Sequence, residues 1–438
     1  MTNKATNQSQ ANTSSFQLWH LINFFYGLIW PGMFTVLMQT YVLDVSGSPE
    51  DAGLVMAMIG LGALATPVFG TLADRYRAHR PIQILATSMV IGGIVIMGFA
   101  EDEMFFVLAA ILIGVGLAPA ITISTVYAVA AGLSQEAEAE AVASLQRMLF
   151  AGVILGGLVI AGLLHLQKQG QISYTALFMI CAGVAALALL LAIFATQDIA
   201  ARVSELAVQR AEKANQDAPP GKFSLGDLFK STFGLGLLVI FLNNMGWIGI
   251  SGQYINFLDG AFGVDRSITS SVNSIAVLLS LVVIGFTGRW IGRVGPVPVL
   301  SAGMLSRVAL ALVLAAVSWA QGGANGIIIL PLLVWIALRL VNPFTGLGDP
   351  VLTARTAIGG VAQAQAAMTA ALALAISLGN ILAGQLAENV GWLALPWQTA
   401  GFCFLAFLVT YFGIRPRLQE GSNKPDPELL LVERKLET

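Results

Sequence analysis

The chain has 438 residues, of which 56% are hydrophobic and 11% are charged, and its 22 basic and 24 acidic residues give a formal net charge of −2. A soluble protein carries about 25% charged residues, so this composition excludes a disordered chain and argues strongly against a water-soluble multidomain enzyme. The near-zero net charge gives no reason to expect a nucleic-acid partner. The composition instead predicts an all-α membrane protein.

The N-terminal segment 1–16 is polar and lacks the basic start and short apolar core of a signal peptide, so we expect a cytosolic tail. A helix needs about 20 apolar residues to cross a bilayer. Twelve such stretches follow, which predicts twelve transmembrane helices. They cover residues 17–43, 52–73, 81–100, 104–131, 141–165, 173–197, 233–258, 268–290, 297–320, 326–348, 357–387 and 392–414.

Lysine and arginine residues are distributed unevenly between the two sides of these spans. If the N-terminus is cytosolic, the inner segments hold nearly all of them, and the outer loops hold only Lys168 and Arg266. Because basic loop residues favour the cytosolic side, both termini are expected in the cytoplasm and the number of spans is even. The predicted protein is an integral, multi-pass protein of the plasma (cell inner) membrane.

The longest internal hydrophilic stretch, residues 198–232, separates two sets of six spans. It places Ile199, Val203 and Leu206 about one turn apart among charged residues, which predicts an amphipathic helix on the inner membrane surface. The predicted domains are therefore a six-helix bundle over 17–197, this cytosolic linker, a second bundle over 233–414 and a cytosolic tail over 415–438.

Landmarks of the first six spans recur in the second six. Leu43 and Asp44 stand at the outer end of span one, as Leu258 and Asp259 do at the outer end of span seven, and glycine pairs recur in spans four and ten. Overall identity between the halves is low. Two parallel six-span halves related by an axis along the membrane normal are an architecture of transporters.

The loop after span two reads Gly-Thr-Leu-Ala-Asp-Arg-Tyr-Arg-Ala-His-Arg over residues 70–80. With this loop and the span layout, the chain resembles the major facilitator superfamily (MFS), whose pattern here is a glycine, three residues, an aspartate and a basic run. The resemblance implies the MFS fold, two pseudo-symmetric six-helix bundles that expose a central site to each side in turn. It also implies an inner gate, with Gly70, Asp74, Arg75, Arg289 and Arg355 as candidate residues.

The gate residues have a physical rationale. Gly70 would let span two approach a partner helix closely, and Asp74 would lie at a helix N-terminus, where an anion is stabilised by about 0.3–1 kcal/mol. The alternative is that the basic residues only anchor the loop on the inner side. The sequence departs from the patterns of proton-driven drug antiporters, since span four has no arginine ahead of Gly114 and span five has no glycine–proline pair.

Every carboxylate is predicted at a span end, in a loop or in a tail, so the usual proton-relay carboxylate at a membrane centre is missing. If protons are used, Asp44 and Asp259 at the outer ends of spans one and seven are the nearest candidates for proton coupling. The alternative is ordinary solvation of two loop carboxylates.

Arg339 lies deep in span ten, with Asn342 and Gly346 on the same helix face. In the superfamily that the chain resembles, spans one, four, seven and ten line the central site. A buried arginine without a nearby carboxylate can bind an anionic substrate group through two hydrogen bonds. The alternatives are pairing with amides or carbonyls and snorkelling toward the inner face. Arg307, in span nine, is expected to face the periphery.

Neutral polar and aromatic residues are dense in spans one and seven, and such groups suit neutral polar or amphipathic solutes. Hydrogen bonds between helices, worth about 0.6 kcal/mol each, are the alternative explanation. With Arg339 and Asn342, the substrate-binding candidates are Asn23, Tyr26, Trp30, Gln39, Tyr127, Asn243, Asn244, Trp247, Gln253 and Tyr254. Further candidates are Thr122, Ser124, Asn273, Gln363 and Gln365.

The leading hypothesis is a secondary active or facilitative transporter of a small organic solute, such as an organic anion or a polar or aromatic metabolite, with or without proton symport. Efflux of amphipathic drugs is one alternative, and a non-transporting assembly factor or receptor of the same fold is another. No nucleotide-binding, metal-ligand or nucleophile motif is found, so neither an enzyme nor a cofactor is expected. We expect a functional monomer in the lipid bilayer.

Overall fold

In a computed structural model, the residues described are 17–130, 135–214, 231–321, 329–356 and 361–422, and these parts are helical without a strand. Within these ranges, twelve helices are long and apolar enough to cross a membrane. Helices are expected in hydrocarbon, because each backbone N–H and C=O must find a partner within its own segment. The prediction of an all-α membrane protein with twelve transmembrane helices is confirmed.

The first bundle holds six membrane-spanning segments, of which the first two consist of several short helices. Pro31 lies in η2, a π-helical turn in the middle of span one, because proline has no backbone N–H to continue a regular α-helix. The bounds are η1 Leu18–His20, α1 Leu21–Gly27, η2 Leu28–Phe34, α2 Thr35–Ser46, α3 Pro49–Gly62, η3 Ala63–Ala65, α4 Thr66–Tyr76, α5 His79–Phe99, α6 Glu103–Ala130, α7 Gln135–Lys168 and α8 Tyr174–Phe194.

The second bundle repeats this plan, with span seven formed by α11 and α12 and span twelve formed by η4, α17 and η5. Its bounds are α11 Thr232–Ser251, α12 Tyr254–Phe262, α13 Arg266–Val294, α14 Pro296–Gln321, α15 Ile329–Thr356, α16 Val361–Asn389, η4 Trp392–Ala394, α17 Leu395–Leu408, η5 Val409–Ile414 and α18 Arg415–Ser422.

Span seven differs from its prediction as one helix over 233–258, because α11 ends at Ser251 and α12 begins at Tyr254. Gly252 lies in the break. A Cβ atom on Gly252 would lie 2.2 Å from Oδ1 of Asn380 on α16 and 2.7 Å from the backbone oxygen of Ile248, so a larger residue would have to displace its neighbours here. This close packing accompanies the interruption of the helix.

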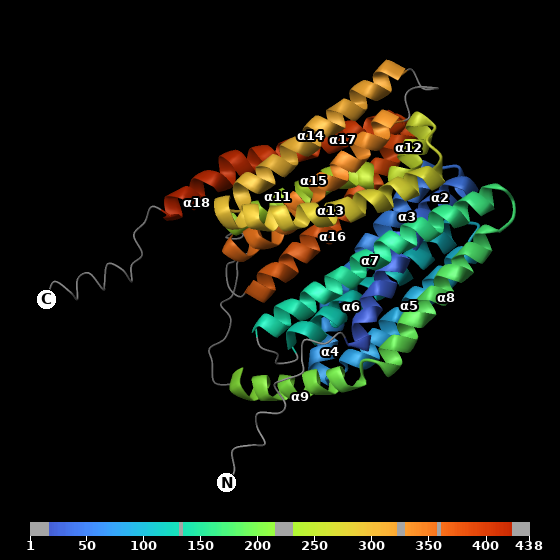
Figure 1. The fold of residues 1–438 in the computed structure, drawn as a ribbon. Helices are drawn as coiled ribbons and strands as arrows, with labels where there is room; N and C mark the ends of the chain where they lie inside the picture. Colours follow the sequence, from blue (N-terminus) through green and yellow to red (C-terminus); the bar gives the residue numbers. More distant parts are fainter. Residues whose placement is uncertain (1–16, 131–134, 215–230, 322–328, 357–360, 423–438) are drawn as a thin grey trace, which may run out of the picture.

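The two bundles lie side by side and separate toward one end, as Figure 1 shows. They are close together where α2 and α12 lie, and they are splayed apart toward the end that carries α9 (Gln197–Ala214) and α18. We call the first end, which holds Asp44, Lys168, Asp259, Asp265 and Arg266, the paired end, and the opposite end the α9 end.

Small residues allow the bundles to approach each other. α16 packs on α3, and α13 packs on α7. A Cβ atom on Gly53 of α3 would lie 2.5 Å from the backbone oxygen of Asn380, and one on Gly157 of α7 would lie 2.0 Å from Oγ of Ser274. Close helix contact in a membrane depends on such residues, because lipid-facing apolar surface supplies no hydrophobic drive for association.

The segments outside the bundles are helical where they are described. α9 packs against α5 and α6 across the end of the first bundle, with Ala200 and Val203 buried (Figure 1). The predicted polar tail begins with α18, which continues span twelve through the π-helical turn η5.

Candidate functional site

One face of α15 carries a series of polar and aromatic residues inside the second bundle. Trp335, Arg339, Asn342, Gly346 and Asp349 are spaced by three or four positions and therefore share this face. Arg339 and Asn342 are partly exposed, Gly346 is exposed, and a Cβ atom on Gly346 would meet no atom within 4 Å. Open space thus borders this face of the helix between Asn342 and Asp349.

Arg339 lies among three aromatic rings. The rings of Trp247 and Tyr254 are both stacked nearly parallel to that of Trp335, with centroids 6.0 Å and 4.7 Å away. The guanidinium carbon of Arg339 lies 4.8 Å from the centroid of the Trp335 ring, 5.6 Å from that of Trp247 and 5.5 Å from that of Tyr254. A cation held near aromatic faces in this way is stabilised by about 0.5–2 kcal/mol.

The hydrogen bonding of Arg339 leaves donors to spare. Its Nε donates to Oδ1 of Asn273 on α13 over 2.8 Å. A guanidinium has five N–H donors, and Asn273 is the one acceptor that the described residues provide. The remaining donors, on a partly exposed side chain, suit a carboxylate or phosphate oxygen.

Arg307 does not face the periphery, and that prediction is wrong. Its side chain is 1% exposed, and it donates from Nη1 to Oδ1 of Asn243 over 2.8 Å and from Nη2 to Oδ1 of Asn342 over 2.7 Å. Its guanidinium carbon also lies 4.7 Å from the centroid of the Trp247 ring. An arginine among lipid chains is costly, and the side chain of Arg307 instead reaches amides on α11 and α15.

Asp349 contradicts the prediction that no carboxylate lies inside a span. α15 continues through Pro350 to Thr356, and Asp349 within it is 8% exposed. Its Oδ1 has no hydrogen-bond partner among the described residues, and its neighbours include Asn244 and Arg307. The predicted end of span ten at residue 348 was therefore too early, and the second bundle holds a buried acid beside a buried base.

The candidates of the first bundle lie apart from this group. The hydroxyl groups of Tyr26 and Thr87 are 2.7 Å apart, and the ring of Trp30 stacks on Phe34. Asn23 and Tyr127 are buried, and Oδ1 of the former and the hydroxyl of the latter find no partner in the described part of the chain.

Two other candidates, Gln253 and Asn244, and Asn256 of the same span make hydrogen bonds that do not involve Arg339. Gln253 donates from Nε2 to the backbone oxygen of Pro49 over 3.1 Å and so joins the two bundles. The Asn256 amide donates over 3.0 Å to the backbone oxygen of Gln39. Asn244 donates to the carbonyl of Ile240 in its own helix. For Gln253, the observed contact agrees with the alternative of hydrogen bonds between helices, whereas Gln39 accepts from Asn256 through its backbone and its Oε1 has no partner among the described residues.

At the paired end, Arg266 joins both carboxylates that were candidates for proton coupling. It donates from Nη1 to Oδ1 of Asp44 and from Nε to Oδ2 of Asp259, each over 2.7 Å. The hydroxyl of Tyr174 also donates to Asp44. The two carboxylates are therefore ion-paired and are not simply solvated.

A second ion pair, between Lys168 of α7 and Asp265 at the start of α13, also crosses between the bundles. Partial burial favours a higher pKa for Asp265, but the hydrogen bonds from Lys168 and Ser267 hold the pKa of this carboxyl at about 2. Asp265 is therefore ionised throughout the physiological range.

The predicted gate residues at the α9 end make no bundle-to-bundle contact that the described side chains show. A Cβ atom on Gly70 would meet nothing within 4 Å, so Gly70 is not at a close helix contact in this conformation. Arg75 lies near the ring of Tyr76, Arg289 donates to the carbonyl of Gly285, and Arg355 is exposed. The side chains of Asp74, Gln363 and Gln365 lie outside the described part.

Sequence reasoning missed Trp335, although its position four residues before Arg339 places it on the same face. It named Asn273 only as a further candidate, and Asn273 is the hydrogen-bond partner of Arg339. Sequence reasoning also missed the inward position of Arg307, which depends on how α14 is rotated toward α15. It missed the buried position of Asp349, which depends on where α15 ends.

Comparison with solved structures shows transporters of the same fold. The nucleoside transporter NupG matches with a TM-score of 0.69 at 15% identity, over 91% of this chain and 98% of that chain. A POT family transporter in complex with 5-aminolevulinic acid matches with a TM-score of 0.64 at 15% identity, over 90% of this chain and 94% of the other. At these identities the likeness concerns the fold alone.

Sequence comparison gives the family. A comparison with curated protein sequences finds no match. The model of the Major Facilitator Superfamily matches residues 19–338 and 236–435, which together cover nearly the whole chain. With twelve membrane-spanning helices in two bundles, this match shows an integral multi-pass membrane protein: the chain belongs to the Major Facilitator Superfamily of small-solute transporters.

Proposed function

We propose that the protein transports a small organic anion with a planar or aromatic part, and that Arg339 binds the anionic group. The observation that carries this proposal is the partly exposed side chain of Arg339, which has one hydrogen-bond acceptor among the described residues and lies beside three nearly parallel rings. A carboxylate can accept two hydrogen bonds from such a group. The three rings are buried, Trp247 the least at 8% exposed, so an aromatic part of the solute would border the site at the edge of Trp247.

Asn342 and Asn243 complete the proposed site by holding Arg307 behind it. The guanidinium groups of Arg307 and Arg339 both lie close to the ring of Trp247. The second arginine adds positive charge to the site without being accessible itself. The two arginines repel each other when the site is empty, and an anion bound at Arg339 would relieve this repulsion.

We further propose that the paired end faces outward, because the sequence places most loop arginines and lysines at the α9 end. In this orientation the ion pairs of Arg266 and Lys168 close the outer side, while the bundles are splayed apart on the inner side (Figure 1). Alternating access then requires these ion pairs to break when the inner side closes.

Asp349 supports proton coupling more directly than Asp44 or Asp259. It is buried in the same helix as Arg339, one of its oxygens has no partner among the described residues, and Arg307 is its basic neighbour. A carboxylate in such a place can gain or lose a proton as the arrangement around Arg307 changes. Asp44 and Asp259, in contrast, are occupied by Arg266.

Paired solutes test the proposed substrate class. Each pair consists of an aromatic carboxylate and its uncharged amide: benzoate with benzamide, nicotinate with nicotinamide, and indole-3-acetate with indole-3-acetamide. Purified full-length protein in proteoliposomes preloaded with each unlabelled solute is assayed for counterflow of its labelled form. We expect counterflow of at least one carboxylate and not of its amide.

Other outcomes distinguish the alternatives. Counterflow of an amide at the same rate as its carboxylate would show that charge is not recognised and would contradict the proposed anion site. Efflux of hydrophobic cationic dyes without counterflow of any carboxylate would favour the drug-efflux alternative. Absence of all transport from correctly folded protein would favour an assembly factor or receptor.

A further inference from the structure

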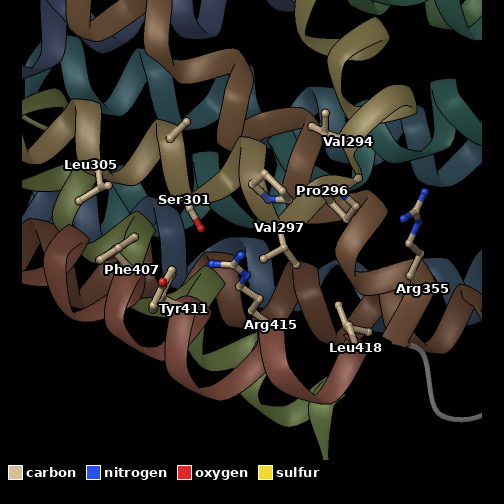
Figure 2. Close-up of a pocket in the computed structure, with 13 residues that line it drawn as sticks. Val294, Pro296, Val297, Ser301, Leu305, Arg355, Phe407, Tyr411, Arg415 and Leu418 are labelled. Atoms are coloured by element: carbon tan, nitrogen blue, oxygen red, sulfur yellow. The ribbon is translucent and has the colours of Figure 1, made fainter. Parts of the chain in front are cut away.

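A groove of about 640 Å³ lies on the second bundle at the α9 end, away from the Arg339 site (Figure 2). It is bordered by the start of α14, the end of α15, and the run from α17 through η5 into α18. Most of its lining is apolar, with Val297, Leu305, Phe407 and Leu418 among the lining residues.

The groove is polar at one end and apolar at the other. Figure 2 shows Arg355 at one end, Leu305 and Phe407 at the other, and Arg415 between them. Leu305 lies nine residues after Pro296 in α14, which corresponds to about 13 Å along the helix axis. The groove therefore runs from the end of the helices into the apolar layer of the membrane.

The charge of the groove is positive. Arg355 and Arg415 both line it, and no carboxylate is among its described lining residues. The described residues provide no ion pair to either guanidinium, and the guanidinium carbon of Arg415 lies 5.0 Å from the centroid of the Tyr411 ring. Tyrosine and arginine at the end of a span are typical of the headgroup region of a bilayer.

We propose that this groove binds one anionic phospholipid from the leaflet at the α9 end. Its anionic headgroup lies over the stretch of the groove between Arg355 and Arg415, where both guanidiniums attract it, and one acyl chain lies along Val297, Ser301 and Leu305 toward Phe407. The lining favours a lipid, because a free phosphate ion would contact only the arginines and would leave the apolar part of the groove empty.

This assignment gives Arg355 a role other than the predicted gate. Arg355 is in the last turn of α15, the helix that carries Arg339, and Arg415 begins α18. A headgroup attracted by both would link the end of α15 to the end of span twelve. The bound lipid is therefore expected to stabilise the arrangement of the second bundle.

Native mass spectrometry of the purified full-length protein tests the proposal without any transport assay. The protein in detergent is mixed with equal amounts of phosphatidylglycerol and phosphatidylcholine of different mass, and the ratio of the two one-lipid complexes is measured. Each basic residue near anionic lipid contributes about 1 kcal/mol to the binding free energy, which changes the binding constant about fivefold. We expect Arg355→Gln and Arg415→Gln each to lower the preference for phosphatidylglycerol about fivefold, and Arg417→Gln, on the same helix as Arg415 but outside the groove, to leave it unchanged.

A fourth variant separates a lipid from a phosphate ion. Ser301→Trp fills the middle of the groove without changing its charge, so it should reduce the one-lipid complexes of both lipids several-fold. An unchanged preference in both arginine variants, or an equal decrease in Arg417→Gln, would overturn the proposal. Unchanged lipid complexes in Ser301→Trp would show that the arginines bind phosphate groups without the groove and would also overturn it.

Discussion

Arg266 of the second bundle donates a hydrogen bond to Asp44 of the first over 2.7 Å, and the same guanidinium holds Asp259 of its own bundle. One side chain thus joins the residues that end spans one and seven, which the internal repeat places in corresponding positions. The arrangement ties the bundles together at the end where they lie closest (Figure 1).

Arg266→Ala is expected to open the paired end. The ion pairs of Arg266 are partly exposed, and such pairs contribute about 1 kcal/mol or less each, so their loss should shift the equilibrium between conformations by about fivefold. The rate at which a membrane-impermeant maleimide labels Thr40→Cys, a residue bordering this site, should rise by that factor. Arg293→Ala, an exposed arginine outside the paired end, is the control and should leave the rate unchanged.

Replacing the amide partners of Arg307 is expected to destabilise the second bundle. In Asn243→Ala the buried guanidinium loses one of its two side-chain acceptors, which costs about 1.5–3 kcal/mol for a charged donor. Asn244→Ala is the comparison on the same helix, because Asn244 donates to the carbonyl of Ile240 and neighbours Asp349 but makes no hydrogen bond to Arg307 among the described residues. The melting temperature of the purified protein should fall clearly for the first variant and by much less for the second. Equal effects would contradict the assigned role of Asn243.

Much of the fold can be predicted from the sequence. Which face of each helix points into its bundle cannot. Apolar runs of about 20 residues require helices in hydrocarbon, and the glycine and small-residue patterns predict close contacts. Arg339 was identified because a charge deep in an apolar run is costly wherever it points. The inward position of Arg307 depends on how α14 packs against α15 and α17, and no local pattern in span nine indicates that packing.

The position of Asp349 was missed for a related reason. Span ten was predicted as an apolar stretch that ends at residue 348, just before Asp349 and Pro350. α15 instead includes both Pro343 and Pro350. Neighbouring helices can accommodate proline in this way within a membrane, and such tertiary support cannot be read from one segment.

Two glycines of span two are expected to respond differently to alanine. A Cβ atom on Gly53 would lie 2.5 Å from the backbone oxygen of Asn380 and 2.9 Å from Cα of Gly384, so Gly53→Ala must push α16 away. Overpacking of this kind costs about 1–3 kcal/mol, which a lower melting temperature would show.

Gly70→Ala is the matched variant, and its added Cβ meets nothing within 4 Å. Its melting temperature should equal that of the unmodified protein. The predicted gate requires Gly70 to make a close contact when the α9 end closes. The counterflow rate of Gly70→Ala should then fall, while its melting temperature stays unchanged. An unchanged rate would remove Gly70 from the gate.

Asp349→Asn tests the proposed proton coupling. The amide keeps the shape of the side chain but cannot exchange a proton, so accumulation of substrate driven by a pH gradient should fall at least about tenfold, while counterflow, which needs no net proton movement, should persist. Asp198→Asn, at the exposed start of α9, is the control and should retain both activities. Accumulation that survives in Asp349→Asn would exclude this residue as the coupling site.

The most direct test of the central claim is the binding of a carboxylate and its amide to Arg339→Gln. Each charged hydrogen bond contributes about 1.5–3 kcal/mol, so the variant should bind the transported carboxylate at least about 10-fold more weakly, and the corresponding amide with nearly unchanged affinity. Isothermal titration of the purified full-length protein measures both constants, with Arg293→Gln as the control. A loss confined to the carboxylate is the predicted result, and unchanged carboxylate affinity in Arg339→Gln would contradict the account.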